Sequence, residues 1–191
     1  MTLLILGLLL FLGVHSVSIF NAPWRDRMHA RLGEAGWKGL YSLVSLAGFV
    51  LIIYGYGAAR LEPVVLYTPP AGLRHLALLL LVPVFPLFLA TYLPGRIQRV
   101  ARHPTLVATK LWALAHLLAN GMLADVLLFG GFLAWAVADR ISLKRRVPRA
   151  LPALPAGKAN DLIALVGGLA LYVAFVFGLH GWLIGVALIP G

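Results

Sequence analysis

The sequence predicts an all-α fold, a polytopic integral membrane bundle of about six transmembrane helices, and its composition is the first observation behind this prediction. Of the 191 residues, 61% are hydrophobic and 12% are charged, and the mean hydropathy is +0.93. Such a chain has more apolar surface than a soluble domain of this length can bury. No segment alternates apolar and polar residues in the manner of a membrane barrel strand, so helical spans are predicted.

Six apolar segments approach the roughly 20 residues that a helical span requires. The first lacks a basic n-region and an A-x-A cleavage pattern, so we expect it to be retained. The fourth is short, and we expect it to begin before Pro104 or to continue past Gly121. Pro83 and Pro86 are expected to kink the third. The segments are Thr2–Ile19, Leu40–Ala58, Leu73–Leu93, Thr105–Ala119, Met122–Ala138 and Asp161–Leu188.

The formal net charge is +10, and 13 of the 16 lysine and arginine residues lie in three connectors between these segments, at 25–38, 96–102 and 140–158. By the positive-inside rule these connectors face the cytoplasm, which places both termini in the periplasm of a bacterium with the chain in its inner membrane. The basic residues then contact lipid headgroups, so membrane lipid is the expected partner and nucleic acid is not. The linker-like stretch Val147–Ala156, with Pro148, Pro152 and Pro155, is too short to separate domains, so one transmembrane domain over residues 1–191 is predicted.

The chain contains no cysteine. This excludes disulfides, iron–sulfur clusters, thiolate-ligated haem and c-type haem attachment. Any metal or haem ligand must therefore be histidine, methionine, tyrosine or a carboxylate.

Histidines are the least expected residues inside the predicted spans. His15, His116 and His180 lie within apolar segments, and His103 lies at the cytoplasmic end of the fourth. An ionisable side chain at membrane depth is energetically unfavourable and marks a functional site by default, although a lone histidine can simply hydrogen-bond a neighbouring helix. Trp112, His116 and Asn120 recur every four residues and so share one helix face. His29 and His75 are expected at the membrane surface or in solvent.

Depth along the helices separates His15 from His116. At about 1.5 Å per residue the two imidazoles differ by roughly 10 Å in depth, too far for direct contact between upright helices. A porphyrin between them, together with helix tilt, could bridge this offset. Ligation of haem b by both histidines would explain two buried imidazoles without a carboxylate partner. A non-haem iron or zinc site built from histidines alone is the alternative.

Three blocks of sequence together resemble the NnrU family of bacterial membrane proteins, and the resemblance runs nearly end to end. The central block is the most specific, because a His-Pro pair is followed thirteen residues after its histidine by a second histidine in a W-x-L-A-H context. The blocks are Gly13-Val14-His15-Ser16, Arg102-His103-Pro104 through Trp112-Ala113-Leu114-Ala115-His116-Leu117-Leu118-Ala119-Asn120-Gly121, and Leu179-His180-Gly181-Trp182-Leu183-Ile184-Gly185-Val186.

This resemblance implies a function. The family is named for its association with nitrite and nitric oxide reduction, and its plant relative is zeta-carotene isomerase, a haem b enzyme that isomerises a cis double bond of a polyene. By position, the relative's essential haem-site histidines correspond to His15 and His116, with His103 at the matching His-Pro position. His180 matches only the bacterial closing motif. The implied substrate is a hydrophobic polyene or another small lipophilic molecule, and the implied catalytic residues are His15 and His116.

Three basic residues are candidates for contact with the haem propionates. They are Arg99, Arg102 and Lys110, of which Lys110 lies two helical turns beyond His103. Ordinary membrane anchoring explains them equally well.

Two other functions stay open. A non-catalytic haem or redox protein tied to denitrification differs from the isomerase only in lacking a polyene substrate. Arg102-His103-Pro104 also resembles the motif of membrane isoprenylcysteine-type methyltransferases that bind S-adenosylmethionine. Thr105-Leu106-Val107-Ala108 follows it here, in place of the tyrosine and glycine usual in those enzymes.

Overall fold

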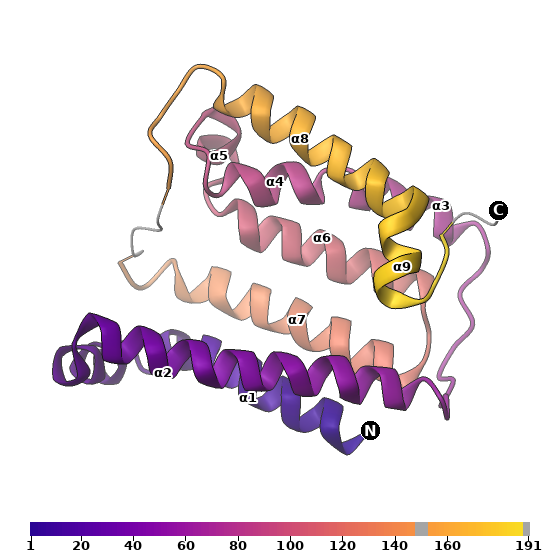
Figure 1. Cartoon of the computed structure of the whole chain (residues 1–191), viewed down its shortest axis with the longest axis horizontal. Coiled ribbons are helices and arrows are strands. Elements are labelled where there is room, and N and C mark those ends of the chain that lie inside the picture. Colours follow the sequence, from indigo (N-terminus) through magenta and orange to yellow (C-terminus); the bar gives the residue numbers. More distant parts are fainter. Residues whose placement is uncertain (148–152, 189–191) are drawn as a thin grey trace. The chain divides into compact units, whose positions relative to one another are not determined.

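The computed structural model describes residues 1–147 and 153–188, and within these residues the chain is helical, as predicted (Figure 1). Backbone pairing between strands is limited there to one isolated bridge, Val65 with Met122. The elements are α1 (Thr2–Phe20), α2 (Ala22–Ala59), α3 (Leu73–Leu81), α4 (Val84–Ala90), α5 (Arg96–Ala101), α6 (Pro104–Ala119), α7 (Leu123–Ser142), α8 (Asn160–Ala174), the π-helical turn Phe175–Leu179 and α9 (His180–Ile184).

Four helical stretches are long and apolar enough to cross a membrane, which confirms a membrane protein. They are α1, α2, α3 with α4, and α8 through α9. The other two predicted spans are also helices. However, α6 has only 16 residues, and α7, with 20, includes three charged residues, Asp125, Asp139 and Arg140.

The expected extension of the fourth span beyond Pro104 or Gly121 is wrong. Pro104 is the first residue of α6, where the missing N–H of proline is tolerated. After Ala119 the Asn120 side chain turns back to donate to the His116 carbonyl oxygen at 2.9 Å. Gly121 then accepts hydrogen bonds from the amides of Leu66 and Tyr67, so the chain leaves the helix there.

The chain forms two compact units, residues 1–70 with 116–148 and residues 71–115 with 149–191. The last residues of α6, from His116, belong to the first unit. Pro148, Arg149 and Pro152 of the fifth connector lie outside the described residues. The predicted single domain stays a prediction.

Glycines join α1 and α2 in the first unit into a close antiparallel pair. A Cβ atom on Gly55 would lie 2.2 Å from the backbone nitrogen of Leu4, and one on Gly48 would lie 2.7 Å from that of Phe11. Small residues that allow backbones to approach this closely are typical of membrane helix pairs. Helix α7 packs along α1, with Gly131 beside the side chains of Leu8 and Leu12.

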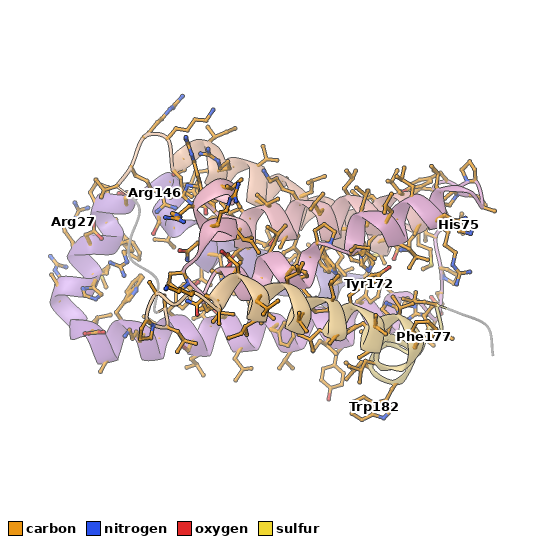
Figure 2. All side chains as sticks on the ribbon, turned by 90° about the horizontal axis from the view of Figure 1, so that it is seen from above. Arg27, His75, Arg146, Tyr172, Phe177 and Trp182 are labelled. Carbon is orange, nitrogen blue, oxygen red and sulfur yellow. The ribbon has the colours of Figure 1, made fainter. Side chains whose placement is uncertain are left out.

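The predicted first connector is itself helical. Helix α2 begins after Asn21, whose side chain caps the amide of Trp24 at 3.0 Å. It bends at Gly33, where φ is 70° and ψ is 171°, a conformation that favours glycine. The bend separates the basic stretch 22–32 from the apolar helix that follows. Arg27 in this stretch and Arg146 after α7 lie at the same end of the first unit (Figure 2).

In the second unit α4 packs on α8, and this contact contains its core. A Cβ atom on Gly168 would lie 2.3 Å from the nitrogen of Pro86, while Ala90, Leu93 and Ala164 are buried together. The predicted kink is confirmed, since α3 ends at Leu81 and α4 begins at Val84.

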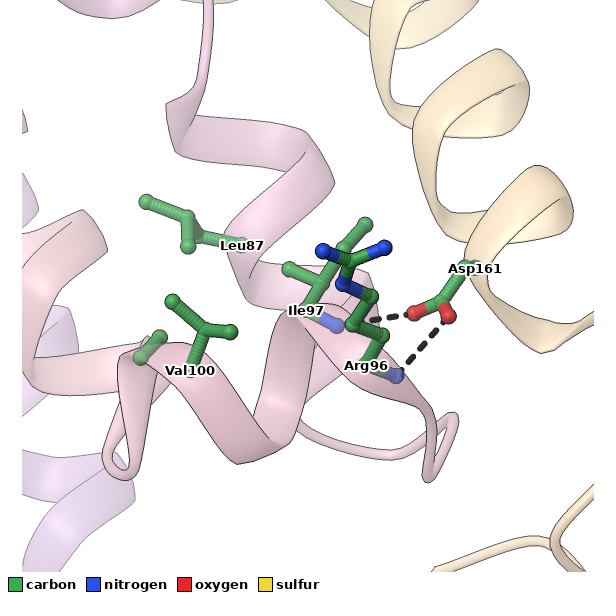
Figure 3. A pocket seen from close by; sticks show the side chains of 6 residues that line it. Leu87, Arg96, Ile97, Val100 and Asp161 are labelled. Atoms are coloured by element: carbon green, nitrogen blue, oxygen red, sulfur yellow. Dashed lines mark hydrogen bonds between the residues drawn. The ribbon is translucent and has the colours of Figure 1, made fainter.

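Asp161 near the start of α8 holds the start of α5. Its two carboxylate oxygens accept hydrogen bonds from the amides of Arg96 at 2.8 Å and Ile97 at 2.9 Å. An open cleft of about 370 Å³ lies beside these residues, with Leu87 and Val100 on its apolar wall (Figure 3).

Candidate functional site

His15 lies among aromatic rings contributed by three helices of the first unit. Its ring stacks on Phe11, one helical turn earlier on α1, with centroids 4.3 Å apart. Tyr41 from α2 lies 5.1 Å away, and Trp135 from α7 meets the imidazole edge-on at 6.1 Å. The imidazole is half-buried, so the surroundings are apolar but one part of the ring stays accessible.

The backbone of α1 orients the His15 ring. Nδ1 of His15 lies 2.6 Å from the carbonyl oxygen of Phe11. Because a carbonyl only accepts hydrogen bonds, Nδ1 carries the proton, and Nε2 of the neutral ring keeps its lone pair. A histidine that donates one ring N–H to a backbone carbonyl and presents the other nitrogen is the usual arrangement of a metal-ligating histidine.

Trp135 presents a polar atom to the same aromatic cluster. Its indole Nε1 is buried and has no hydrogen-bond partner among residues 1–147 and 153–188. An unsatisfied buried donor destabilises a protein by about 1–3 kcal/mol, so native structures contain few of them. Trp135, the edge-on neighbour of His15, therefore carries a buried donor that is not satisfied by the described residues.

His116 occupies a second aromatic contact in the first unit. Its ring stacks on Phe129 of α7, with centroids 4.4 Å apart and an interplanar angle of 24°. Phe129 in turn lies edge-on to Tyr56 of α2 at 6.4 Å. The His116 carbonyl oxygen accepts from both the backbone and the side-chain amide of Asn120, so Asn120 ends the helix that carries His116.

A buried carboxylate, Asp125, lies one turn before Phe129 on α7 and is not among the residues that the sequence suggested for the site. Asp125 is 0% exposed. Its Oδ1 accepts from the Tyr56 hydroxyl at 2.6 Å, and its Oδ2 accepts from the backbone amide of Met122 at 3.0 Å. The available signal was local: an acidic residue in the first turn of a helix pairs with the free amides there. Nothing in the sequence indicated Tyr56.

The two histidines contact α7 at different heights along that helix. His15 is beside Trp135 and His116 is on Phe129. These two positions are six residues apart, which corresponds to about 9 Å along the helix. This separation is close to the offset of roughly 10 Å expected from the sequence.

The other predicted cofactor residues belong to the second unit. Arg99 is exposed on α5, and Lys110 and Trp112 are half-buried on α6. His103 directly precedes α6 and accepts the Leu106 amide at 3.1 Å through its carbonyl oxygen.

Two of these residues have unusual local geometry. Arg102 has φ 59° and ψ −43°, and the next amide, of His103, donates to the Ala101 carbonyl across it at 2.6 Å. That is a strained γ-turn. His180, at the start of α9, has Nδ1 2.8 Å from the Val186 carbonyl oxygen, which closes the turn after that helix.

Metal coordination by several acidic or histidine side chains is not seen in the part of the chain that the structure describes. No group of three or more His, Cys, Asp or Glu residues there is arranged to hold a metal ion.

Comparison with known proteins identifies one family. The family model described as NnrU protein matches residues 3–188 of the chain. No curated protein and no solved structure matches it significantly.

Proposed function

The chain belongs to the NnrU family, and from this premise we propose that it is an integral membrane protein that binds haem b through His15. The observation that supports the proposal most directly is the orientation of the His15 ring by the Phe11 carbonyl. This hydrogen bond fixes the tautomer in which Nε2 can ligate iron.

The residues around His15 fit such a cofactor chemically. Haem b needs a neutral imidazole, apolar walls for its macrocycle and polar groups for its edge. Phe11, Tyr41 and Trp135 line the imidazole, and the Trp135 N–H has no other partner in the described residues. Phe11, Tyr41 and Trp135 carry no formal charge at neutral pH, so the environment is favourable for a flat, mostly apolar ligand.

His116 as a second axial ligand stays a prediction. His15 and His116 lie beside positions of α7 that are about 9 Å apart along the helix, and the surroundings of His15 support a role as iron ligand better than those of His116. His15 has an oriented ring in an aromatic cluster, whereas His116 is stacked on Phe129 close to the end of α6. We therefore assign the first ligand to His15.

The proposed activity is cis–trans isomerisation of a polyene such as zeta-carotene. It rests on the resemblance to the plant isomerase. When bound, haem b supplies an iron whose oxidation state and coordination can change. The protein would orient the lipophilic substrate and exclude water through its aromatic side chains. A protein that binds haem yet leaves a cis-polyene unchanged under reducing conditions would instead be the non-catalytic redox protein.

We further propose a multi-pass topology in the bacterial inner membrane with the basic end of the first unit in the cytoplasm. Arg27 and Arg146 lie at that end (Figure 2), and lysine and arginine are enriched in cytoplasmic connectors. With this orientation both termini are periplasmic. Accessibility of single cysteines introduced at positions 27 and 62 to a membrane-impermeant reagent tests it.

Absorption spectra of the purified full chain test haem binding. Expressed with ample haem, the wild type is expected to show a Soret band that shifts on reduction. His15→Ala is expected to lose or alter this band, and His116→Ala tests the second ligand. His29→Ala is the matched control, since His29 lies in the basic stretch of α2 outside the aromatic cluster. A wild type without a Soret band, or a His15→Ala protein with an unchanged one, would refute the proposal.

A further inference from the structure

An open cleft lies at the basic end of the first unit, between the ends of α1 and α7. Its volume is about 380 Å³. Ser18 and Ala22 border it on one side, and Ala138, Ser142, Arg145 and Arg146 border it on the other. The lining combines small side chains and two isoleucines, Ile19 and Ile141, with two guanidinium groups, so the cleft favours an anionic group on an otherwise apolar ligand.

The cleft begins one helical turn beyond the aromatic cluster. Ser18 is three residues after His15 on α1, and Ala138 is three residues after Trp135 on α7. Three residues correspond to about 4.5 Å along a helix and return to nearly the same face. The cleft and the His15 cluster are thus successive levels between the same two helices.

The two arginines of the cleft differ in their partners. Arg146 is paired with Asp139 at 2.5 Å and also donates to the Ser142 hydroxyl at 3.0 Å. Its charge is therefore largely compensated. Arg145 is exposed. Its backbone amide donates to the Ser142 carbonyl oxygen at 2.8 Å, but its guanidinium makes no hydrogen bond or ion pair with any residue that the structure describes, so the five N–H donors of this group can serve a ligand.

We infer that Arg145 binds the carboxylate groups of a tetrapyrrole whose iron is held by His15, an inference that rests on the proposed function. The two propionates of haem b lie along one edge of the macrocycle. Their binding site must therefore lie to one side of the iron ligand and toward water. The cleft meets both conditions, and arginine pairs with carboxylates through charge-assisted, often bidentate hydrogen bonds. Arg146, held by Asp139, lines the same cleft and shapes it.

This assignment differs from the residues that the sequence suggested for the propionates. Arg99, Arg102 and Lys110 belong to the second unit, whereas Arg145 lies just after the end of α7, the helix that contributes Trp135 to the aromatic cluster of His15. In the sequence Arg145 is one of several basic residues in the fifth connector, and nothing there distinguishes it from Lys144.

Equilibrium binding of two porphyrins to the full chain in detergent tests the inference. Haemin carries both carboxylates, and haemin dimethyl ester carries neither. Binding is followed by the Soret band in wild type, Arg145→Gln and Lys144→Gln. The last is the matched control because it removes a neighbouring charge that does not line the cleft.

Arg145→Gln is expected to weaken haemin binding by about threefold to tenfold, as loss of a partly exposed charge pair predicts, and to leave binding of the ester unchanged. Lys144→Gln is expected to bind both porphyrins like the wild type. Equal loss for haemin and ester, equal loss in both variants, or no loss in Arg145→Gln would overturn the inference while leaving haem binding intact. A wild type that binds neither porphyrin would instead overturn the proposed function, and this inference with it.

Discussion

The Tyr56 hydroxyl donates a hydrogen bond of 2.6 Å to a carboxylate oxygen of Asp125, which is fully buried. The two residues are 69 positions apart in the chain and connect α2 with the start of α7. A buried carboxylate is tolerated when its oxygens are hydrogen-bonded. The second oxygen of Asp125 is occupied by the Met122 amide, so the pair fixes one end of the first unit.

Replacing Tyr56 with phenylalanine tests this relationship. The substitution leaves one oxygen of a buried carboxylate without its donor, and we expect it to lower the free energy of unfolding by about 1–3 kcal/mol. Thermal or denaturant unfolding in detergent measures the change. Tyr54→Phe is the control, because Tyr54 is 70% exposed and should tolerate the loss of its hydroxyl. Equal destabilisation in the two variants would contradict a specific role for the Tyr56 hydrogen bond.

Close contact between α1 and α2 is tested by Gly55→Ala. The new methyl group would lie 2.2 Å from the Leu4 nitrogen, so the helices must separate, and we expect a loss of stability of about 1–3 kcal/mol. Gly57→Ala adds the same methyl group to the same helix where no other atom lies within 4 Å. The greater helix propensity of alanine should leave that control as stable as the wild type or slightly more stable. Similar unfolding curves for the two variants would contradict the packing described here.

Strain at Arg102 predicts a stabilising substitution. Because φ is 59° at this residue, Arg102→Gly should raise the free energy of unfolding by about 1 kcal/mol. Arg99→Gly removes the same charge from within α5, where glycine disfavours the helix by about the same amount. The two substitutions should therefore shift the unfolding midpoint in opposite directions. A lower unfolding midpoint for Arg102→Gly would contradict this prediction, because the Arg102 side chain would then stabilise the fold by more than the positive φ destabilises it.

The pKa of Tyr67 predicts that the stability of the fold depends on pH in the alkaline range. Partial burial, and then the charge of Asp125, raise the pKa of the Tyr67 hydroxyl, which donates to the Leu117 carbonyl oxygen. Since the pKa is higher in the folded than in the unfolded chain, Tyr67 favours folding below its ordinary pKa, and this contribution is lost as the pH rises through the raised value. A spectrophotometric tyrosine titration of wild type and Tyr67→Phe should differ by one tyrosine that ionises above the ordinary range. If the tyrosine that Tyr67→Phe lacks ionises in the ordinary range in the wild type, the raised pKa of Tyr67 is contradicted.

Features that depend on local sequence were predicted correctly. The apolar segments became helices, and Pro83 and Pro86 interrupted the third. Local sequence was less reliable at ends of elements. The connector before Leu40 was helical, and the non-helical φ and ψ of Gly33 place a kink between this basic helical stretch and the apolar helix that follows. The fourth span ended at Ala119 because Asn120 and Gly121 find partners outside it.

By itself the sequence determined the membrane class, the helical spans, the exclusion of cysteine-based cofactors and the choice of His15 and His116 as the residues to explain. These follow from composition and from the 3.6-residue period, which are properties of neighbouring residues. Only the tertiary structure decided that Tyr56 pairs with Asp125, that the Trp135 N–H beside His15 lacks a partner among the described residues, and that Arg145 lines a cleft one turn from that cluster. Each of these depends on which faces of α1, α2 and α7 pack together. That packing brings together residues that are far apart in the chain, and local sequence patterns do not predict such contacts.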